Sequence, residues 1–327
     1  PADVTEFEGF GATTSGGNNG TVVEVSSLDD AGPGTLREAL SKGNNHRIVF
    51  TVGGTIELQR RLEIRGKASI TIDGFTAPPP GITLQGNMLY VRNSDDIIVT
   101  NLRVRDSVAD GILVWDGSSH VVIDHCSVTN AADENISITE DTSNVTVSWC
   151  IIGDTRPDSF DRNTKGMLIA NFTGAPVTRV SLHHNLFHNE FQRSPQISTA
   201  GVFDVRNNVI REWGEYGIRM RNGASGNIIN NVFATNIKPQ NAVLLVADPG
   251  PIYIHGNQGP GAMDVNALST ASSPFSVAPV TTDPVTDVEL KVLQGVGAWP
   301  RDVIDRTLTG VASVPARPSP PQRLRVE

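Results

Sequence analysis

The chain has 327 residues, of which 38% are hydrophobic and 19% charged, and its formal net charge is −9 at pH 7. Such an acidic chain has no global electrostatic reason to bind nucleic acid, and it would bind a polyanion only through local basic side chains or a bridging cation. The sequence contains no apolar run long enough for a transmembrane helix, so we expect a globular protein that does not cross a membrane.

The first predicted elements lie near the N-terminal end. Thr35 and Glu38 form a capping-box pair after the turn at 32–34, so we expect a short helix over Leu36–Ser41. Short strands are expected to follow at 48–52, 55–58, 70–72 and 82–84. Because unpaired strand edges invite aggregation, we expect the helix to cap the first of these strands.

A short strand motif then recurs along the chain. In aligned copies of this motif, one column reads Leu102, Cys126, Cys150, Asn185, Asn208, Asn231 and Asn257, with spacings of 24, 24, 35, 23, 23 and 26 residues. Strands of three to five residues at this period are too closely spaced for helical repeats. The pattern predicts coils of three short strands that stack at about 4.8 Å, which is a parallel β-helix.

Equivalent residues of successive coils are expected to lie on top of one another. Stacked Asn185, Asn208 and Asn231 can then hydrogen-bond side chain to side chain, which gives them a structural role. Cys126 and Cys150 occupy the same column one coil apart. We expect them to be stacked, buried thiols, with a strained disulfide as the alternative.

Three histidines, His183, His184 and His188, invite comparison with a zinc site. Adjacent residues on a strand point to opposite faces, so His183 and His184 are not expected to bind the same metal ion. The pattern therefore disfavours zinc.

The repeat fades after about residue 268 into a segment rich in Pro, Ser and Thr, and a short helix is expected near 287–293. We expect one β-helix domain over 1–317 and a C-terminal tail over 318–327. The chain begins at Pro1 without a Met, which suggests a processed form that has lost a signal peptide. We therefore expect a secreted protein, and we expect it to be a monomer.

Several segments resemble pectate lyases of polysaccharide lyase family 1 and keep the order of that family. They are Phe-Glu-Gly-Phe-Gly at 7–11, Gly-Pro-Gly-Thr-Leu-Arg at 32–37, Val-Ile-Asp-His-Cys-Ser at 122–127, Val-Thr-Val-Ser-Trp-Cys at 145–150, His-His-Asn-Leu-Phe at 183–187 and Trp-Pro-Arg-Asp-Val-Ile-Asp at 299–305. The resemblance implies an all-β, single-domain right-handed parallel β-helix with a short N-terminal capping helix. It also implies cleavage of α-1,4-linked polygalacturonate by β-elimination, with Ca²⁺ and an arginine base.

Acidic residues at two places in the repeat suggest a calcium site. Asp110 matches a principal calcium ligand of the family, and Asp133 and Glu134 follow one coil later. The spacing of 23 residues between Asp110 and Asp133 predicts that they stack nearly in register, where their charges would repel unless a cation lay between them. The family's further acidic positions are Val108 and Ser137 in this chain, so the substrate carboxylate is expected to complete the calcium shell.

Basic residues supply the other expected site groups. Arg193 matches the catalytic arginine of the family, and Lys165, in the 35-residue coil, lies where the family has a substrate-binding lysine. The second arginine of the family is Ser198 in this chain. Arg219 or Arg221, from the following coil, is expected to compensate by binding substrate carboxylates, although both could equally be exposed salt-bridge partners.

Two other functions remain open from the sequence. A β-helical polygalacturonase, which is a hydrolase, needs two or three carboxylates as acid and base, and the Asp-Asp pairs at 29–30 and 95–96 lie too early in the chain for that role. A non-catalytic polysaccharide-binding β-helix is the third alternative. All three functions have an acidic polysaccharide as the expected partner.

Overall fold

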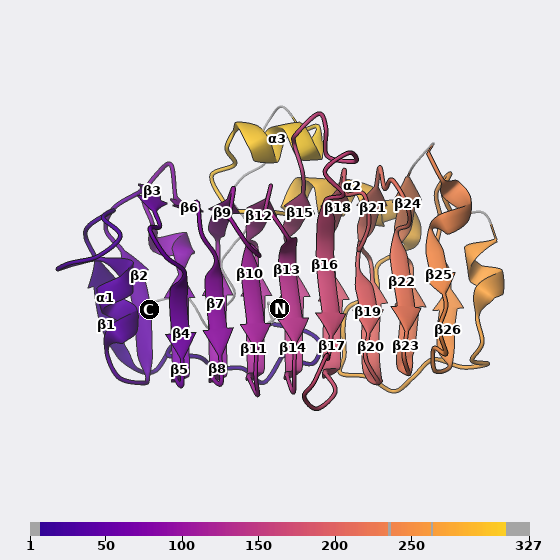
Figure 1. Cartoon of the computed structure of the whole chain (residues 1–327), viewed down its shortest axis with the longest axis horizontal. Helices are drawn as coiled ribbons and strands as arrows, with labels where there is room; N and C mark the ends of the chain where they lie inside the picture. The colour runs from indigo at the N-terminus through magenta and orange to yellow at the C-terminus, as the bar shows by residue number, and fades with distance from the viewer. Residues whose placement is uncertain (1–6, 235–236, 263, 312–327) are drawn as a thin grey trace, which may run out of the picture.

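The computed structural model describes residues 7–234, 237–262 and 264–311, and in these residues three parallel sheets run side by side along one long axis (Figure 1). Sheet A contains β1 (Thr21–Val25), β2 (His46–Phe50), β5 (Ala68–Asp73), β8 (Asp95–Thr100), β11 (Ser119–Asp124), β14 (Ser143–Ser148), β17 (Thr178–His183), β20 (Gly201–Arg206), β23 (Ala224–Ile229) and β26 (Ile252–His255). Sheet B contains β3 (Gly54–Glu57), β6 (Ile82–Gln85), β9 (Leu102–Arg105), β12 (Ser127–Thr129), β15 (Ile151–Gly153), β18 (Leu186–His188), β21 (Val209–Arg211) and β24 (Val232–Ala234). Sheet C contains β4 (Leu62–Arg65), β7 (Leu89–Arg92), β10 (Ile112–Trp115), β13 (Glu134–Thr139), β16 (Lys165–Ala170), β19 (Gln196–Ser198), β22 (Ile218–Arg221) and β25 (Val243–Leu245).

The predicted parallel β-helix is confirmed. The spacing of the sequence repeat equals the number of residues between paired positions in neighbouring coils. In sheet A, Val99, Ile123 and Val147 pair one after another in steps of 24 residues. The next step, from Val147 to Leu182, is the long coil of 35 residues. All of these side chains are buried and point into the core. Stacked β-branched and leucine side chains therefore form a continuous apolar column inside the coils.

The column of asparagines forms the expected amide ladder. Asn185 donates from its side chain to Asn208 at 3.0 Å, Asn208 donates to Asn231 at 3.0 Å, and Asn231 donates to Asn257 at 3.0 Å. The ladder continues past the repeat to Asn266, which accepts from Asn257 at 3.1 Å. Asn185, Asn208, Asn231 and Asn257 are only 0–3% exposed, and these bonds satisfy their amides, so the structural interpretation of the asparagines is confirmed.

The cysteines of the same column are confirmed as buried free thiols. Cys126 and Cys150 each donate to a backbone carbonyl of the preceding coil, at 3.8 Å to Val99 and 3.6 Å to Ile123. Burial, together with the neighbouring Cys126, raises the pKa of Cys150 well above its ordinary value. Both thiols therefore act as small core residues.

One expectation about the histidines is wrong. His183 is the last residue of β17, and His184 already has a left-handed backbone with φ of 55°, so the two side chains do not alternate as they would within a strand. Their Nδ1 atoms lie 3.0 Å apart. His184 stacks on Trp149 with ring centroids 4.4 Å apart and bonds Asp283 through Nε2 at 2.8 Å. Both histidines are buried in a structural stack.

The expected N-terminal cap is present. Helix α1 (Leu36–Ser41) begins after Thr35, whose hydroxyl accepts from the Glu38 N–H at 3.2 Å. The Glu38 carboxylate accepts from the Gly34 N–H at 2.6 Å, one residue before the position that a capping box would use. Strand β1, which the sequence analysis did not identify, extends sheet A beyond β2, and α1 contacts it.

Two helices cover sheet B from outside. Helix α2 (Val285–Gly295), expected near 287–293, contacts β21 and β24, and its buried Val288 and Val292 belong to an apolar cluster on the outward side of sheet B. Helix α3 (Val303–Thr309) was not predicted. Its Asp305 is fully buried and pairs with Arg105 of β9 at 2.8 Å, a contact between residues 200 positions apart. No helix in the described residues is long and apolar enough to span a membrane.

The helices on sheet B leave another face for the functional site. Sheet C faces the viewer in Figure 1, with α2 and α3 lying to one side of it. The tail over 318–327 lies outside the described residues.

The amide ladder makes a testable prediction. Asn208→Ala removes the acceptor of the Asn185 backbone and side-chain N–H groups and the donor to the Leu182 carbonyl. Since each unsatisfied buried group costs about 1–3 kcal/mol, we expect the free energy of unfolding to fall by about 2–4 kcal/mol. Urea denaturation would measure the loss, with the exposed Asn19→Ala as the matched control, which should change it by less than about 0.5 kcal/mol. Equal values for the two variants would contradict the structural role.

Candidate active site

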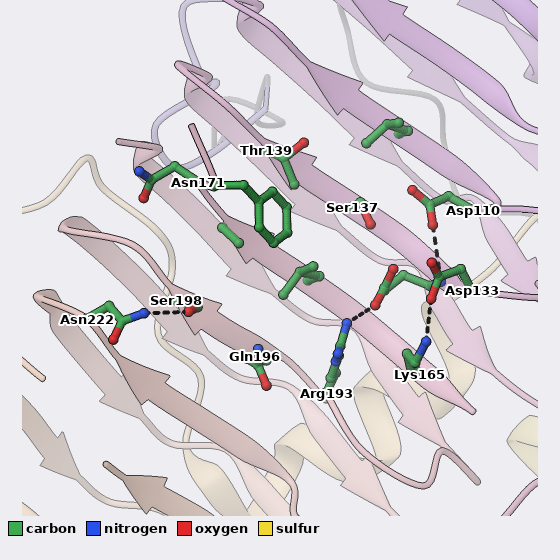
Figure 2. A pocket seen from close by; sticks show the side chains of 15 residues that line it. Asp110, Asp133, Ser137, Thr139, Lys165, Asn171, Arg193, Gln196, Ser198 and Asn222 are labelled. Atoms are coloured by element: carbon green, nitrogen blue, oxygen red, sulfur yellow. Dashed lines mark hydrogen bonds and ion pairs between the residues drawn. The ribbon is translucent and has the colours of Figure 1, made fainter. Parts of the chain in front are cut away.

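A groove lies on the exposed face of sheet C, over β10, β13, β16 and β19 (Figure 2). Alternate residues of these strands line it: in β13, Ile136 points into the core, while Ser137 and Thr139 face the groove. The register aligns Ser137 with Leu168 and Thr139 with Ala170 of the next coil. The groove encloses about 640 Å³, which is within the range of sites that hold small ligands.

The three acidic residues expected to bind calcium come together at one end of the groove. Asp110, Asp133 and Glu134 each place a carboxylate oxygen within 4.8 Å of the other two, and we call them the acidic cluster. The ladder pairs Ile112 with Ile136, a step of 24 residues, so the register equivalent of Asp110 is Glu134 rather than Asp133. The Glu134 N–H donates to Asp110 Oδ1 at 3.2 Å, and Asp133 reaches the cluster from the turn before β13.

Two basic side chains face the acidic cluster from the next coils. Lys165 lies opposite Glu134 in the ladder, and its ammonium group pairs with Asp133. Lys165 is the first residue of β16, and the extra residues of the long coil lie on either side of this strand, at 154–164 and at 171–177. Arg193 lies just before β19 and pairs with Glu134. Figure 2 shows both basic side chains pointing at the acidic cluster.

Arg193 is held in an unusual local environment. Its backbone has a left-handed φ of 67°, which an arginine rarely adopts, and this conformation stands at the turn into β19. Its side chain is about one-fifth exposed. Within the described part of the chain, its Nε is buried and has no acceptor. Glu134 is thus the acidic partner of an otherwise incompletely bonded guanidinium.

The acidic cluster carries an electrostatic cost. Burial raises the pKa of Asp110 to about 6, and the negative charge of Asp133 adds to this effect. Lys165 and Arg193 oppose the shift but do not cancel it. At neutral pH all three carboxylates are therefore close together and short of positive charge, which is the condition under which a bound cation is favoured.

Arg219 and Arg221 lie one coil beyond the groove, in β22. They pair in the ladder with Gln196 and Ser198, and neither lines the groove. Arg219 donates from Nε to Gln196 Oε1 at 2.9 Å and stacks its guanidinium 4.2 Å from the Tyr216 ring centroid. Arg219 therefore orients Gln196, and a substrate-binding role for Arg219 and Arg221 stays a prediction.

The groove also contains residues that the sequence analysis did not identify. Gln196 occupies the groove-facing row with Leu168, so extending the repeat by one coil would have found it. Asn171, Phe172 and Asn222 line the groove from turns that follow strands, where the strand period gives no signal.

Comparisons with known proteins agree with the fold and the resemblance. Residues 62–210 match the family described as "Right handed beta helix region". The chain is 37% identical over 258 residues to a probable pectate lyase C of Aspergillus terreus, which covers 76% of this chain and 57% of that protein. It is 26% identical to a pectate trisaccharide-lyase of Thermotoga maritima over 66% of this chain and 56% of that protein.

A solved structure extends the comparison of folds. The pectate lyase of Bacillus sp. N165, determined in complex with trigalacturonate, superposes with a TM-score of 0.66 at 20% identity, over 89% of this chain and 98% of that one. This chain spans little more than half the length of the curated relatives named above, at 57% and 56%. The resemblance to pectate lyases is thus confirmed over most of the chain, and with it the right-handed parallel β-helix that it implied.

Proposed function

We propose that residues 1–317 form the catalytic domain of a secreted, monomeric, calcium-dependent pectate lyase that cleaves α-1,4-linked polygalacturonate. The observation that carries the proposal is the convergence of the acidic cluster with Lys165 and Arg193 at one end of a groove on the open sheet. The names of the relatives supply the reaction class: pectate lyase C and pectate trisaccharide-lyase.

The residues of the acidic cluster fit a calcium ion. Calcium takes six to eight oxygen ligands and prefers carboxylates, and this cluster offers three of them on neighbouring coils. Val108 and Ser137 add no carboxylate, which leaves positions for water and for a uronate of the substrate. Bound here, calcium would supply Lewis-acid chemistry that stabilises negative charge on the uronate. Asp110, Asp133 and Glu134 are the residues that would hold it.

Arg193 is the proposed base. It would take the proton from C5 of the uronate while the C4–O bond breaks, which forms the C4–C5 double bond and returns a proton to the leaving oxygen. Arginine serves as a base only where its charged form is disfavoured. Lys165 lines the same groove, and the buried Nε of Arg193 has no acceptor among the described residues.

Glu134 has two possible uses with opposite consequences. As the partner of Arg193, it stabilises the charged guanidinium and keeps it from accepting a proton. As a cation ligand together with Asp110 and Asp133, it leaves the guanidinium without that partner. The proposed activity therefore needs Glu134 in its second use, with Lys165 free to bind a substrate carboxylate in place of Asp133.

The shifted pKa of Asp110 predicts how stability depends on pH without calcium. The folded value of about 6 lies above the ordinary 3.8, so the folded protein holds this proton more tightly. The contribution of Asp110 to stability therefore falls as pH rises from about 4 to about 6. Asp110→Asn should remove this loss and raise the free energy of unfolding at pH 8, by at most about 3 kcal/mol, but not at pH 4. Calorimetry in EDTA would test this, with the exposed Asp248→Asn as the control; a gain at pH 4 would contradict the assignment.

Calcium should have the opposite effect on the same variants. We expect the ion to raise the melting temperature of the wild type, by an amount equivalent to about 2.7 kcal/mol at a concentration of one hundred times its dissociation constant. Asp110→Asn and Asp133→Asn should lose most of this increase, whereas Asp248→Asn should keep it. A calcium response that is equal in all four proteins would show that the acidic cluster is not the site.

An activity assay tests the reaction class and the base. With calcium and polygalacturonate, we expect the unsaturated uronate product, measured by its ultraviolet absorbance, and EDTA should abolish it. Arg193→Ala should lower kcat roughly 10²- to 10⁴-fold with the fold retained, and the exposed Arg162→Ala should leave kcat unchanged. New reducing ends without the absorbance would favour the hydrolase, and binding without either product would favour the non-catalytic β-helix. Retention of most of the rate by Arg193→Ala would remove it as the base.

A further inference from the structure

The end of the groove away from the acidic cluster is formed by a short turn with an exposed aromatic ring. Strand β16 ends at Ala170, and the turn after it carries Phe172, which is 71% exposed and lines the groove. A single exposed apolar side chain is common on protein surfaces. Exposure of Phe172 alone therefore indicates no function. The hydrogen bonds that fix the conformation of its turn are the evidence for one.

A buried carboxylate holds this turn in place. Glu140 is 8% exposed, and its Oε1 accepts from the N–H groups of Phe172 at 2.8 Å and Thr173 at 3.3 Å. Its Oε2 accepts from the Gly174 N–H at 2.6 Å. A Cβ at residue 174 would lie 2.6 Å from that same oxygen, so any other residue there would displace the carboxylate. Three charge-assisted bonds to one carboxylate fix the backbone of the turn, and its largest side chain is left facing the groove.

The groove lining on the side of the ring is polar but uncharged. Thr139, Ala170 and Ser198 form one groove-facing row across three coils, and Asn222 donates to Ser198 at 3.0 Å. Among the described residues that line the groove, the ionised side chains belong to the acidic cluster, Lys165 and Arg193. Figure 2 shows Thr139 and Asn171 on the side away from Lys165.

The separation of these two ends exceeds one sugar ring. Lys165 and Ala170 are five residues apart along β16, which corresponds to about 16 Å of strand. A ligand that reaches from the acidic cluster to Phe172 must therefore be an extended chain. Hydroxyl and amide groups of Thr139, Ser198 and Asn222 suit sugar hydroxyls, and the Phe172 ring suits the apolar C–H face of a pyranose.

We propose that Phe172 is an aromatic platform for a sugar ring of the substrate chain several units from the reacting bond, and that Glu140 positions it. The inference rests on the proposed function for the identity of the chain as polygalacturonate. Contacts of an aromatic ring of this kind change affinity by roughly three- to tenfold. Because the platform lies away from the reacting atoms, it contributes to binding of long chains and not to the chemical step.

The kinetic test compares substrates of two lengths in the presence of calcium. Phe172→Ala should raise KM for polygalacturonate roughly three- to tenfold and leave kcat unchanged, with a much smaller effect on trigalacturonate. Phe172→Tyr keeps the ring and should restore the wild-type KM. Leu290→Ala, which removes a similarly exposed apolar side chain on α2, is the control and should change neither value. Equal effects of Phe172→Ala on both substrates, or no effect on either, would overturn the platform.

The positioning role of Glu140 has its own variant. Glu140→Gln replaces one acceptor oxygen by an amide N–H group that cannot accept from the turn, so it should loosen the turn while filling the same space. We expect the same selective rise in KM for polygalacturonate as in Phe172→Ala, and no additional rise in the double variant. A fall in kcat on both substrates would instead assign Glu140 a general structural role.

Binding without turnover separates this inference from the proposed reaction. Isothermal titration of polygalacturonate into the wild type and into Phe172→Ala should show weaker binding by the variant, again roughly three- to tenfold. Equal affinities would overturn the platform whatever the activity. Absence of the unsaturated product with the wild type, together with weaker binding by Phe172→Ala, would overturn the lyase proposal and support the platform.

Discussion

The hydrogen-bonded register between successive coils is the constraint on which the rest of this structure depends. Each strand pairs with the equivalent strand about 24 residues later, as Val121 does with Val145, so a step in sequence becomes one strand spacing in space. The same ladder stacks the core, aligns the asparagines and delivers Asp110, Glu134 and Lys165 to one edge of sheet C. The core and the site are therefore two faces of one repeating geometry.

That geometry also brings together groups that repel. Stacking places carboxylates of neighbouring coils next to each other, and burial together with the charge of Asp133 raises the pKa of Asp110. Lys165 and Arg193 reduce this repulsion by pairing with Asp133 and Glu134, but the same pairing occupies the groups proposed to act on the substrate. The site is thus arranged for exchange of partners, and a cation and an anionic sugar are the ligands that complement it.

Features set by the period of the repeat were predictable from the sequence, and features set by other contacts were not. Repeat spacing identified the β-helix, the amide ladder and the buried thiols, because each depends only on stacking. The acidic cluster was predicted from the spacing together with the family resemblance, although Asp110 is in register with Glu134 and not with Asp133. It did not identify helix α3, whose Asp305 is held by Arg105 some 200 residues away, or the contact of His183 with His184, which depends on a left-handed backbone at a strand end. Phe172 was missed because its turn is fixed by Glu140 from the preceding coil, a relation with no signal in the spacing.

The segment that contains α2 and α3 links coils that are not neighbours, and this affects how cooperatively the coils unfold. In a solenoid each coil contacts only its neighbours, so it can lose order from either end one coil at a time. Here α2 packs against β21 and β24, while α3 contacts β15 and Asp305 binds β9, so one stretch of chain spans distant coils. Opening any coil in this span disturbs contacts with the others, so we expect the groove-bearing coils to unfold as a single cooperative unit.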